Sequence, residues 1–309
     1  MPELPEVETL RRELSVIKGK IIELATIKWP KMTHPLSPAK FQQKLKNKKI
    51  VSVNRRAKIL ILKLSDGNYI LIHLKMTGQL IYKPYVIGHK LIIGGHPLPP
   101  PPNSPLPKDH SGAGGQGQEQ KLLLLPNKHT HIIIDFKDKS ILYFNDLRKF
   151  GWMRLVGQQD IDELENNFGP EPLSDKFSFK VFKQTISRYP NRKIKQTLMD
   201  PKIIAGIGNI YADESCFCAR VLPMRRVKDI TELELKKIYQ CLRRILKLAI
   251  SKRGTSVDTY IQLDGSRGGF VPYLMVYGRG GQLCKKCDQP IKKIKLAGRG
   301  THFCGSCQT

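Results

Sequence analysis

Acidic residues are scarce in this chain. It has 26 Asp and Glu against 53 Lys and Arg, so its formal net charge at pH 7 is +27 and its sequence pI is about 9.9. Such an imbalance favours a polyanionic partner, and nucleic acid above all. Neutralisation of phosphates should dominate the affinity for that partner and make it strongly salt-dependent.

The chain also lacks long apolar runs. None approaches the roughly 20 residues that a helix needs to cross a bilayer, which excludes a spanning protein. An anionic membrane surface would suit the charge as well, but the basic residues are spread along the whole chain and not confined to one amphipathic helix. We see no signal peptide and expect a cytoplasmic protein. The length suggests about two domains, and 40% hydrophobic residues are enough for a buried core.

The cysteines fall into two groups. Four of them form two C-x2-C pairs separated by sixteen residues: Cys284, Cys287, Cys304 and Cys307. This spacing is typical of a tetrahedral zinc site, and a zinc with all four positions taken should be structural and not catalytic. Disulfides or free thiols are the alternative. Three cysteines are left over, which suits a reducing compartment: Cys216, Cys218 and Cys241.

The first residues contain a candidate nucleophile. Pro2 is small enough for the initiator methionine to be removed, which would leave a free secondary amine. Such an amine can attack an electrophilic sugar carbon and form an iminium, as an activated lysine does. An α-amino group titrates at about 7.7–8.0, and Glu3 stands beside it to move a proton. The alternative is an ordinary helix start, because proline and acidic residues suit the first turn.

Hydrophobic spacing predicts strands in the first half of the chain and helices in the second. Residues 4–18 repeat apolar positions at helical spacing and stop at Gly19. Short strand-like runs follow, with Asp66-Gly67 as a hairpin signal: 50–53, 59–64, 69–74, 131–136 and 141–144. One helix and several strands indicate a β-sandwich with a helix on it. From about residue 157 the pattern turns helical, most clearly at 193–200, 209–219 and 231–252.

Residues 84–128 differ in kind. Seven of the eleven residues from 97 to 107 are proline, and 111–120 is rich in glycine and glutamine. Such a segment cannot fill a core, so we expect a flexible, partly extended insertion between two strands of the sandwich. We expect it to be dispensable surface, and a polyproline segment that binds a partner is the alternative.

Eight sequence blocks follow one another along the chain. They are MPELPEVET (1–9), RRAKILIL (55–62), HLKMTG (73–78), DLRKFG (146–151), NFGPEPLSD (167–175), IKQTLMDPKIIAGIGNIYADE (194–214), VYGRGGQLCKKC (276–287) and AGRGTHFCGSC (297–307). In this order they resemble the bacterial formamidopyrimidine-DNA glycosylases. The resemblance covers nearly the whole chain except about residues 84–128.

The resemblance implies an α+β multidomain fold. An N-terminal catalytic β-sandwich with a packed N-terminal helix would occupy residues 1–156, with the low-complexity insertion at 84–128. A helical helix–two-turns–helix DNA-binding domain would follow at 157–275. A C-terminal zinc finger with a β-hairpin, holding one structural Zn²⁺, would occupy residues 276–309.

The resemblance also implies a bifunctional DNA glycosylase and AP lyase of base-excision repair. Such an enzyme excises oxidised purines, 8-oxoguanine and formamidopyrimidines among them, through an N-terminal proline Schiff base followed by β,δ-elimination. It would act as a monomer on damaged double-stranded DNA in the bacterial cytoplasm, associated with the nucleoid. A glycosylase must take the damaged nucleotide out of the stack before it acts on it.

Motif positions then assign roles to residues. The catalytic residues would be Pro2 as nucleophile, Glu3 beside it, Lys58 in β-elimination and Arg299 in δ-elimination. Arg299 lies between the two zinc knuckles, so the zinc would be a scaffold that directs it at the DNA.

The remaining assignments concern DNA contacts. Met76, Arg148 and Phe150 would fill the emptied space in the duplex, with the arginine facing the orphaned cytosine. The other contacts would be His129, Lys195 and Asn209. His131 is an alternative match for His129, and the basic contact usual before Lys195 cannot be placed within 188–192.

Some of these residues have simpler explanations. Without the motifs, core packing would account for Met76 and Phe150, and a solvated basic face for the run at 55–58. The glycines of 206–209 would let the backbone approach a phosphate at a helix N-terminus. The glycine-rich segment 258–273 would be a mobile loop that closes over the extruded base.

Two other functions stay open. The endonuclease VIII branch, which favours oxidised pyrimidines, typically starts PEGPE, whereas this chain starts PELPE after Met1 and has the arginine–phenylalanine pair of the purine-specific branch. A non-catalytic zinc-finger DNA-binding protein is the second alternative. Retention of Met1 would favour it, because the amine would then be primary and displaced by one residue.

Overall fold

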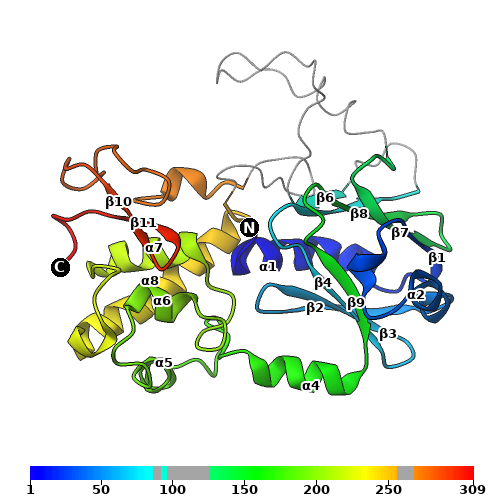
Figure 1. Ribbon diagram of the computed structural model, residues 1–309, viewed down its shortest axis with the longest axis horizontal. Helices are drawn as coiled ribbons and strands as arrows, with labels where there is room; N and C mark the ends of the chain where they lie inside the picture. Colours follow the sequence, from blue (N-terminus) through cyan, green and yellow to red (C-terminus); the bar gives the residue numbers. More distant parts are fainter. Residues whose placement is uncertain (86–91, 96–124, 256–267) are drawn as a thin grey trace, which may run out of the picture.

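The computed structural model describes residues 1–85, 92–95, 125–255 and 268–309. Figure 1 shows them as two lobes, one of strands and one of helices, with α1 (Leu4–Glu13) between the two. Most of the insertion predicted at 84–128, and most of the loop expected at 258–273, lies outside the described residues.

The strand-rich lobe contains nine strands among the described residues. In chain order, β1 to β9 are Ile22–Ile27, Ile50–Arg56, Ile59–Leu64, Tyr69–His73, Gly78–Lys83, Ile92–Gly95, Thr130–Phe136, Ile141–Asp146 and Trp152–Val156. They form one antiparallel sheet in the order β1-β7-β8-β5-β6 and a second in the order β2-β3-β4-β9. The predicted sandwich is confirmed, although β1, β5, β6 and β9 were not among the predicted strands.

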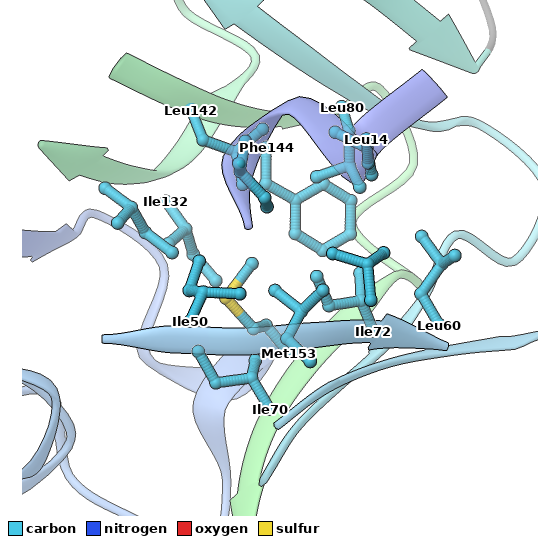
Figure 2. Close-up of a cluster of buried hydrophobic side chains, with 14 of the residues drawn as sticks. Leu14, Ile50, Leu60, Ile70, Ile72, Leu80, Ile132, Leu142, Phe144 and Met153 are labelled. Carbon is cyan, nitrogen blue, oxygen red and sulfur yellow. The ribbon is translucent and has the colours of Figure 1, made fainter. Parts of the chain in front are cut away.

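The core of this lobe lies between the two sheets. Figure 2 shows Leu80 and Phe144 of one sheet facing Ile72 and Met153 of the other. Leu14 joins them from the short 3-10 turn η1 (Leu14–Ile17) that continues α1. The apolar face of the first helix is thus anchored in the sandwich, as its spacing predicts. A second helix, α2 (Pro38–Leu45), follows the 3-10 turn η2 (Pro30–Thr33) and packs on β1.

The second lobe is helical. It contains α5 (Phe179–Ile186), α6 (Ile194–Met199), α7 (Asn209–Ala219) and α8 (Glu232–Ser251), with 3-10 turns η3 (Val227–Asp229) and η4 (Val271–Tyr273). The preceding helix, α4 (Gln158–Asn167), packs Ile161 and Leu164 on β3 and β4 of the first lobe. The three helices predicted at 193–200, 209–219 and 231–252 are confirmed. In the part of the chain that the structure describes, no helix is both long and apolar enough to cross a membrane.

One disulfide ties two of these helices together. Cys218 of α7 and Cys241 of α8 are bonded, with their Cα atoms 5.8 Å apart. The sequence analysis left both among three unpaired thiols. In the structure only Cys216 remains a free thiol outside the four-cysteine group. The two cysteines are 23 residues apart on different helices, and the sequence does not show that these helices pack with the two thiols in contact.

The chain ends in a hairpin of β10 (Lys292–Leu296) and β11 (Arg299–Phe303). Leu296 pairs with Arg299, so Ala297 and Gly298 form a two-residue turn, and their φ angles are 47° and 77°. Two positive φ angles are what the tight hairpin turn with matching twist requires. The turn makes Arg299 the first residue of the returning strand.

An arginine pair fastens the two lobes. Arg55 donates to both oxygens of Glu171 at 3.0 Å, and Arg56 lies 3.2 Å from the same carboxylate and 2.6 Å from Glu165. Arg56 is buried and also donates to backbone carbonyls of 165, 168 and 169. The run at 55–58 is therefore not a solvated basic face. Its arginines hold the connector that follows α4.

Removing Glu171 should test this connection. In Glu171→Ala the two guanidinium groups lose a shared partner, and Glu171 is partly buried. We expect the free energy of unfolding to fall by about 2–3 kcal/mol, between the values for exposed and fully buried pairs. The measurement is urea denaturation, with the exposed Glu163→Ala of α4 as the matched control. Equal stability of the two variants would show that the pair does not join the lobes.

Candidate active site

The N-terminus lies between the two lobes (Figure 1). Met1 is 48% exposed, whereas Pro2 and Glu3 are buried. The Leu4 N–H donates to Gly206 O at 3.0 Å, in the turn before α7. The Glu3 N–H donates to Glu6 Oε2 at 2.8 Å, which fixes the first turn of α1. These contacts hold Pro2 in place beside the helical lobe.

The carboxyl group of Glu3 sits at the N-terminal end of α7. Its Oε1 accepts the Ile210 N–H at 3.0 Å, and a side chain at Gly208 would overlap it. A Cβ at Gly206, whose φ is +81°, would meet Leu4. The sequence analysis assigned these glycines to a phosphate. In the structure they make room for the N-terminal segment, and contact with a phosphate stays a prediction.

Lys58 faces the same turn. It follows β2, and its Nζ donates to Ile207 O at 3.0 Å. Burial lowers the pKa of Lys58, an effect that the charges of Glu3 and Glu6 oppose and that of Arg299 reinforces. Burial likewise raises the pKa of Glu3, against the charge of Lys58. A carboxyl and an ammonium whose pKa values are shifted toward each other in this way are suited to proton transfer.

Arg299 completes the group. It lies at the tip of the C-terminal hairpin with its side chain exposed. Its neighbour Gly300 accepts a hydrogen bond from Asn209, the residue before the Ile210 N–H that binds Glu3. The turn before α7 and the start of that helix thus connect Glu3, Lys58 and the strand that begins at Arg299, three distant parts of the sequence.

Met76, Arg148 and Phe150 form one exposed cluster. Arg148 Nη1 lies 3.1 Å from Met76 Sδ, and its guanidinium carbon lies 4.8 Å from the centre of the Phe150 ring. Met76 and Phe150 are 45% and 54% exposed. Core packing does not account for either of them. Apolar side chains and an arginine held together on the surface suit insertion into a base stack.

A buried carboxylate that the sequence analysis did not single out supports this cluster. Asp146 is fully buried and accepts the Arg148 N–H at 3.1 Å and the Gly151 N–H at 2.6 Å. The Thr77 hydroxyl also donates to it. Asp146 therefore joins the loops of Met76 and Arg148. The sequence signal that could have identified Asp146 is its position directly before a turn, because aspartates there often accept hydrogen bonds from nearby backbone N–H groups.

His73 was missed as well. Burial and the charges of Lys75 and Lys58 lower the pKa of His73 to about 3, so its imidazole is neutral near pH 7. Its Nδ1 accepts the Lys75 N–H at 2.9 Å, which shapes the loop that carries Met76. His73 is the first residue of the HLKMTG block. A histidine in a strand has no sequence pattern that distinguishes a residue that shapes a loop from one that only packs in the core.

The two histidine matches differ in accessibility. His131 is buried, and its Nε2 bonds to Asp146 O at 2.8 Å. His129 is half-buried, and its backbone N–H donates to Asn127 Oδ1 at 2.9 Å. Burial and the neighbouring charges of Lys128, His131 and Lys149 lower its pKa. Of the two, His129 is the one whose side chain is free to meet a ligand.

Lys195 and Asn209 both reach the C-terminal hairpin. Lys195 is 1% exposed and donates to Gly300 O at 2.9 Å and Thr301 Oγ1 at 2.8 Å. Asn209 is half-buried and donates to Gly300 O at 3.0 Å. A direct phosphate contact by Lys195 stays a prediction that its burial does not favour. Within 188–192, Arg188 is exposed and Arg192 is paired with Asp200.

The four cysteines of the C-terminal pairs converge. Their Sγ atoms lie within 4.8 Å of one another, with 3.9 Å between Cys284 and Cys307 and 3.4 Å between Cys287 and Cys304. Tetrahedral zinc with bonds of about 2.3 Å sets its sulfur ligands about 3.8 Å apart. The site therefore fits one structural zinc at the base of the hairpin.

Comparison with known families matches three consecutive parts of the chain. Residues 1–153 match the formamidopyrimidine-DNA glycosylase N-terminal domain, and residues 168–260 match the formamidopyrimidine-DNA glycosylase H2TH domain. Residues 281–309 match a zinc finger found in FPG and IleRS.

Full-length relatives agree with these matches. The chain is 38% identical to a formamidopyrimidine-DNA glycosylase of Halalkalibacterium halodurans and 33% identical to one of Herpetosiphon aurantiacus, with all of both chains covered in each case. A Lactococcus lactis FPG mutant in complex with a Fapy-dG-containing DNA is 31% identical, covers 99% of both chains and has a TM-score of 0.80. The L. lactis Fpg with an abasic-site DNA has a TM-score of 0.79 and 31% identity.

Zinc content is directly measurable. We expect about one zinc per chain by elemental analysis, because the four thiolates offer one complete tetrahedral site. Cys284→Ser should lose the metal and unfold the hairpin, since metal binding and folding of a small module are coupled. Cys216→Ala, which changes a buried thiol outside the site, should keep its zinc. Purified, folded wild-type protein without metal would exclude the zinc site.

Proposed function

The chain belongs to the formamidopyrimidine-DNA glycosylase family, and we propose that it excises oxidised purines from damaged DNA with the amine of Pro2 as nucleophile. It is a DNA glycosylase of base-excision repair that acts on double-stranded DNA. The observation that carries the proposed mechanism is the burial of Pro2 and Glu3 against the turn before α7, to which the Lys58 ammonium also bonds. Burial raises the pKa of Glu3 and lowers that of Lys58.

The reaction would begin after removal of Met1. The lone pair of the Pro2 nitrogen attacks C1′ of the damaged nucleotide, and the bond from C1′ to the base breaks. The base leaves with a proton, and opening of the sugar ring gives an iminium between C1′ and Pro2. Glu3, whose pKa is raised by burial, serves these proton transfers.

Strand cleavage would follow from the iminium. It acidifies the proton on C2′, and loss of that proton expels the 3′ phosphate in β-elimination. A further proton loss at C4′ expels the 5′ phosphate in δ-elimination. Lys58 would serve the first step and Arg299 the second. Lys58 bonds to the turn that also holds the N-terminal segment, Arg299 begins the strand bound to the start of α7, and cations favour the departing phosphates.

Access to C1′ requires that the damaged nucleotide leave the stack. We propose that Phe150 and Met76 enter the emptied space while Arg148 hydrogen-bonds the opposite cytosine. Their exposure and mutual contact support this role. Unstacking costs a few kcal/mol, which such wedges partly offset. His129 and Asn209 would bind flanking phosphates.

We propose three functional regions: 1–156 for catalysis, 157–275 for DNA binding and 276–309 for the zinc finger. We also propose that the protein acts as a monomer on nucleoid DNA in the bacterial cytoplasm. The exposed Arg148–Phe150 pair favours the purine-specific branch over the endonuclease VIII branch. A non-catalytic DNA-binding protein would need no buried acid and base beside its first residues.

Borohydride trapping tests the nucleophile. On duplex DNA with 8-oxoguanine opposite cytosine, wild-type protein should form a covalent adduct that maps to Pro2. Pro2→Gly should reduce trapping and excision strongly while DNA binding persists, because only the amine changes. N-terminal sequencing checks that Met1 has been removed. An adduct that maps to Lys58 or another lysine would refute the role of Pro2.

The opposite-base preference tests Arg148. A good arginine contact to a base edge is worth about 1–3 kcal/mol of discrimination. Arg148→Ala should therefore flatten the preference for cytosine by roughly tenfold while weakening the binding of undamaged DNA less. Single-turnover excision opposite each of the four bases provides the measurement. Arg154→Ala is the matched control, because Arg154 is also an exposed arginine over an aromatic ring. An unchanged ranking would leave Arg148 as a phosphate contact.

A further inference from the structure

The Lys195 ammonium donates two hydrogen bonds to the C-terminal hairpin and lies in ion-pair contact with Asp213. Its Nζ lies 2.9 Å from Gly300 O, 2.8 Å from Thr301 Oγ1 and 2.7 Å from Asp213 Oδ1. A lysine ammonium has three N–H donors and no acceptor. The side chains of Lys195 and Asp213 are 1% and 0% exposed, so this is an ion pair inside the protein. A phosphate could reach Lys195 only by displacing one of these partners.

Asp213 holds the same strand at its next residue. Its Oδ2 accepts the His302 N–H at 2.9 Å and lies 3.3 Å from His302 Nδ1. Asn209, one turn earlier on α7, adds a bond to Gly300 O at 3.0 Å. Three consecutive residues of β11, 300 to 302, are therefore fixed by side chains of α6 and α7.

Arg299 directly precedes these three residues. Arg299 is bonded directly to Gly300, so a shift of the strand at residues 300–302 also moves the backbone of Arg299. The effect of Arg299 on the pKa of Lys58 depends on its position. The ion pair thus lies behind Arg299, on the side away from the solvent.

We propose that Lys195 and Asp213 are positioning residues that hold Arg299 over the reaction centre, and that Lys195 acts on the DNA only through the hairpin. This inference rests on the proposed function, because it concerns the elimination step assigned to Arg299. It changes the role of Lys195 from a phosphate contact to an internal support. It also gives Asp213, an anion in a strongly basic protein, a part in binding DNA.

The two roles predict opposite effects for Asp213→Asn. Removal of a negative charge from a DNA-binding protein should strengthen binding if only the general field matters. Positioning predicts weaker binding, because the hairpin and Arg299 lose their support. The roles also differ in additivity. Independent phosphate contacts add in free energy, whereas residues that act through one another do not.

The experiment uses full-length zinc-loaded protein and duplex DNA with a pre-formed abasic site. Affinity as a function of salt and the ratio of δ- to β-elimination product are measured for Lys195→Met, Asp213→Asn, Arg299→Ala and the Lys195→Met/Arg299→Ala double variant. We expect Asp213→Asn and Lys195→Met each to weaken binding and to lower the product ratio about tenfold or more. The double variant should behave as Arg299→Ala alone, with the same salt slope.

A milder variant and its control test the same role without removing a buried charge, so they keep the test decisive where a charge variant fails to fold. Thr301→Val removes one acceptor of Lys195 without leaving a charge unpaired, and it should lower the product ratio in the same direction. Thr197→Val changes a buried threonine of α6 that bonds to Lys193 O instead, and it should have no effect. Zinc content checks that each variant keeps its hairpin, and if Asp213→Asn loses zinc the Thr301→Val comparison decides.

Several results would overturn the positioning role. One is a double variant whose salt slope falls by about 0.9 below that of Arg299→Ala, as expected for an independent phosphate contact by Lys195. Another is Asp213→Asn or Thr301→Val with wild-type affinity and product ratio. Wild-type protein that gives no trapped adduct would instead refute the proposed nucleophile, while the affinity and salt comparisons would still decide the role of the pair.

Discussion

The burial of Glu3 beneath the first turn of α7 is the constraint on which the site depends. Its carboxyl takes the place at this helix end where an anion is favoured, and Gly208 leaves room for it. Pro2, Lys58 and the turn at 206–209 are arranged around that carboxyl. Burial then shifts the pKa of Glu3 upward and that of Lys58 downward. One packing contact between the two lobes therefore sets the position of the Pro2 amine and shifts the pKa values of Glu3 and Lys58.

Sequence patterns predicted much of the fold because hydrophobic spacing reports burial on one face. The first helix, the strands around 50–74 and the three helices of the second lobe were visible in this way. β5 was not, since five of its six residues are buried and no alternation remains. β1 has an irregular register against β7, which also blurs a period of two.

The site was predicted where a short motif carries it and missed where distant residues make it. Met76, Arg148 and Phe150 each lie in a recognisable block. Asp146 works through donors from two loops, and Thr77 is 69 residues away. Lys195 was assigned by its motif as a DNA contact, a role that needs an accessible ammonium. Its partners on β11 lie 105 and 106 residues later, so only the folded chain shows its burial.

The hairpin places the zinc and Arg299 at opposite ends of one rigid arm. Five residues of strand span roughly 16 Å, so a tilt of about 5° at the cysteines would move the tip by roughly 1.4 Å. Side chains of α6 and α7 hold residues 300–302 near the tip, so the strand is supported at both ends and such a tilt is resisted. The position of Arg299 therefore depends on two supports, the four cysteines at one end of the strand and Lys195, Asn209 and Asp213 near the other.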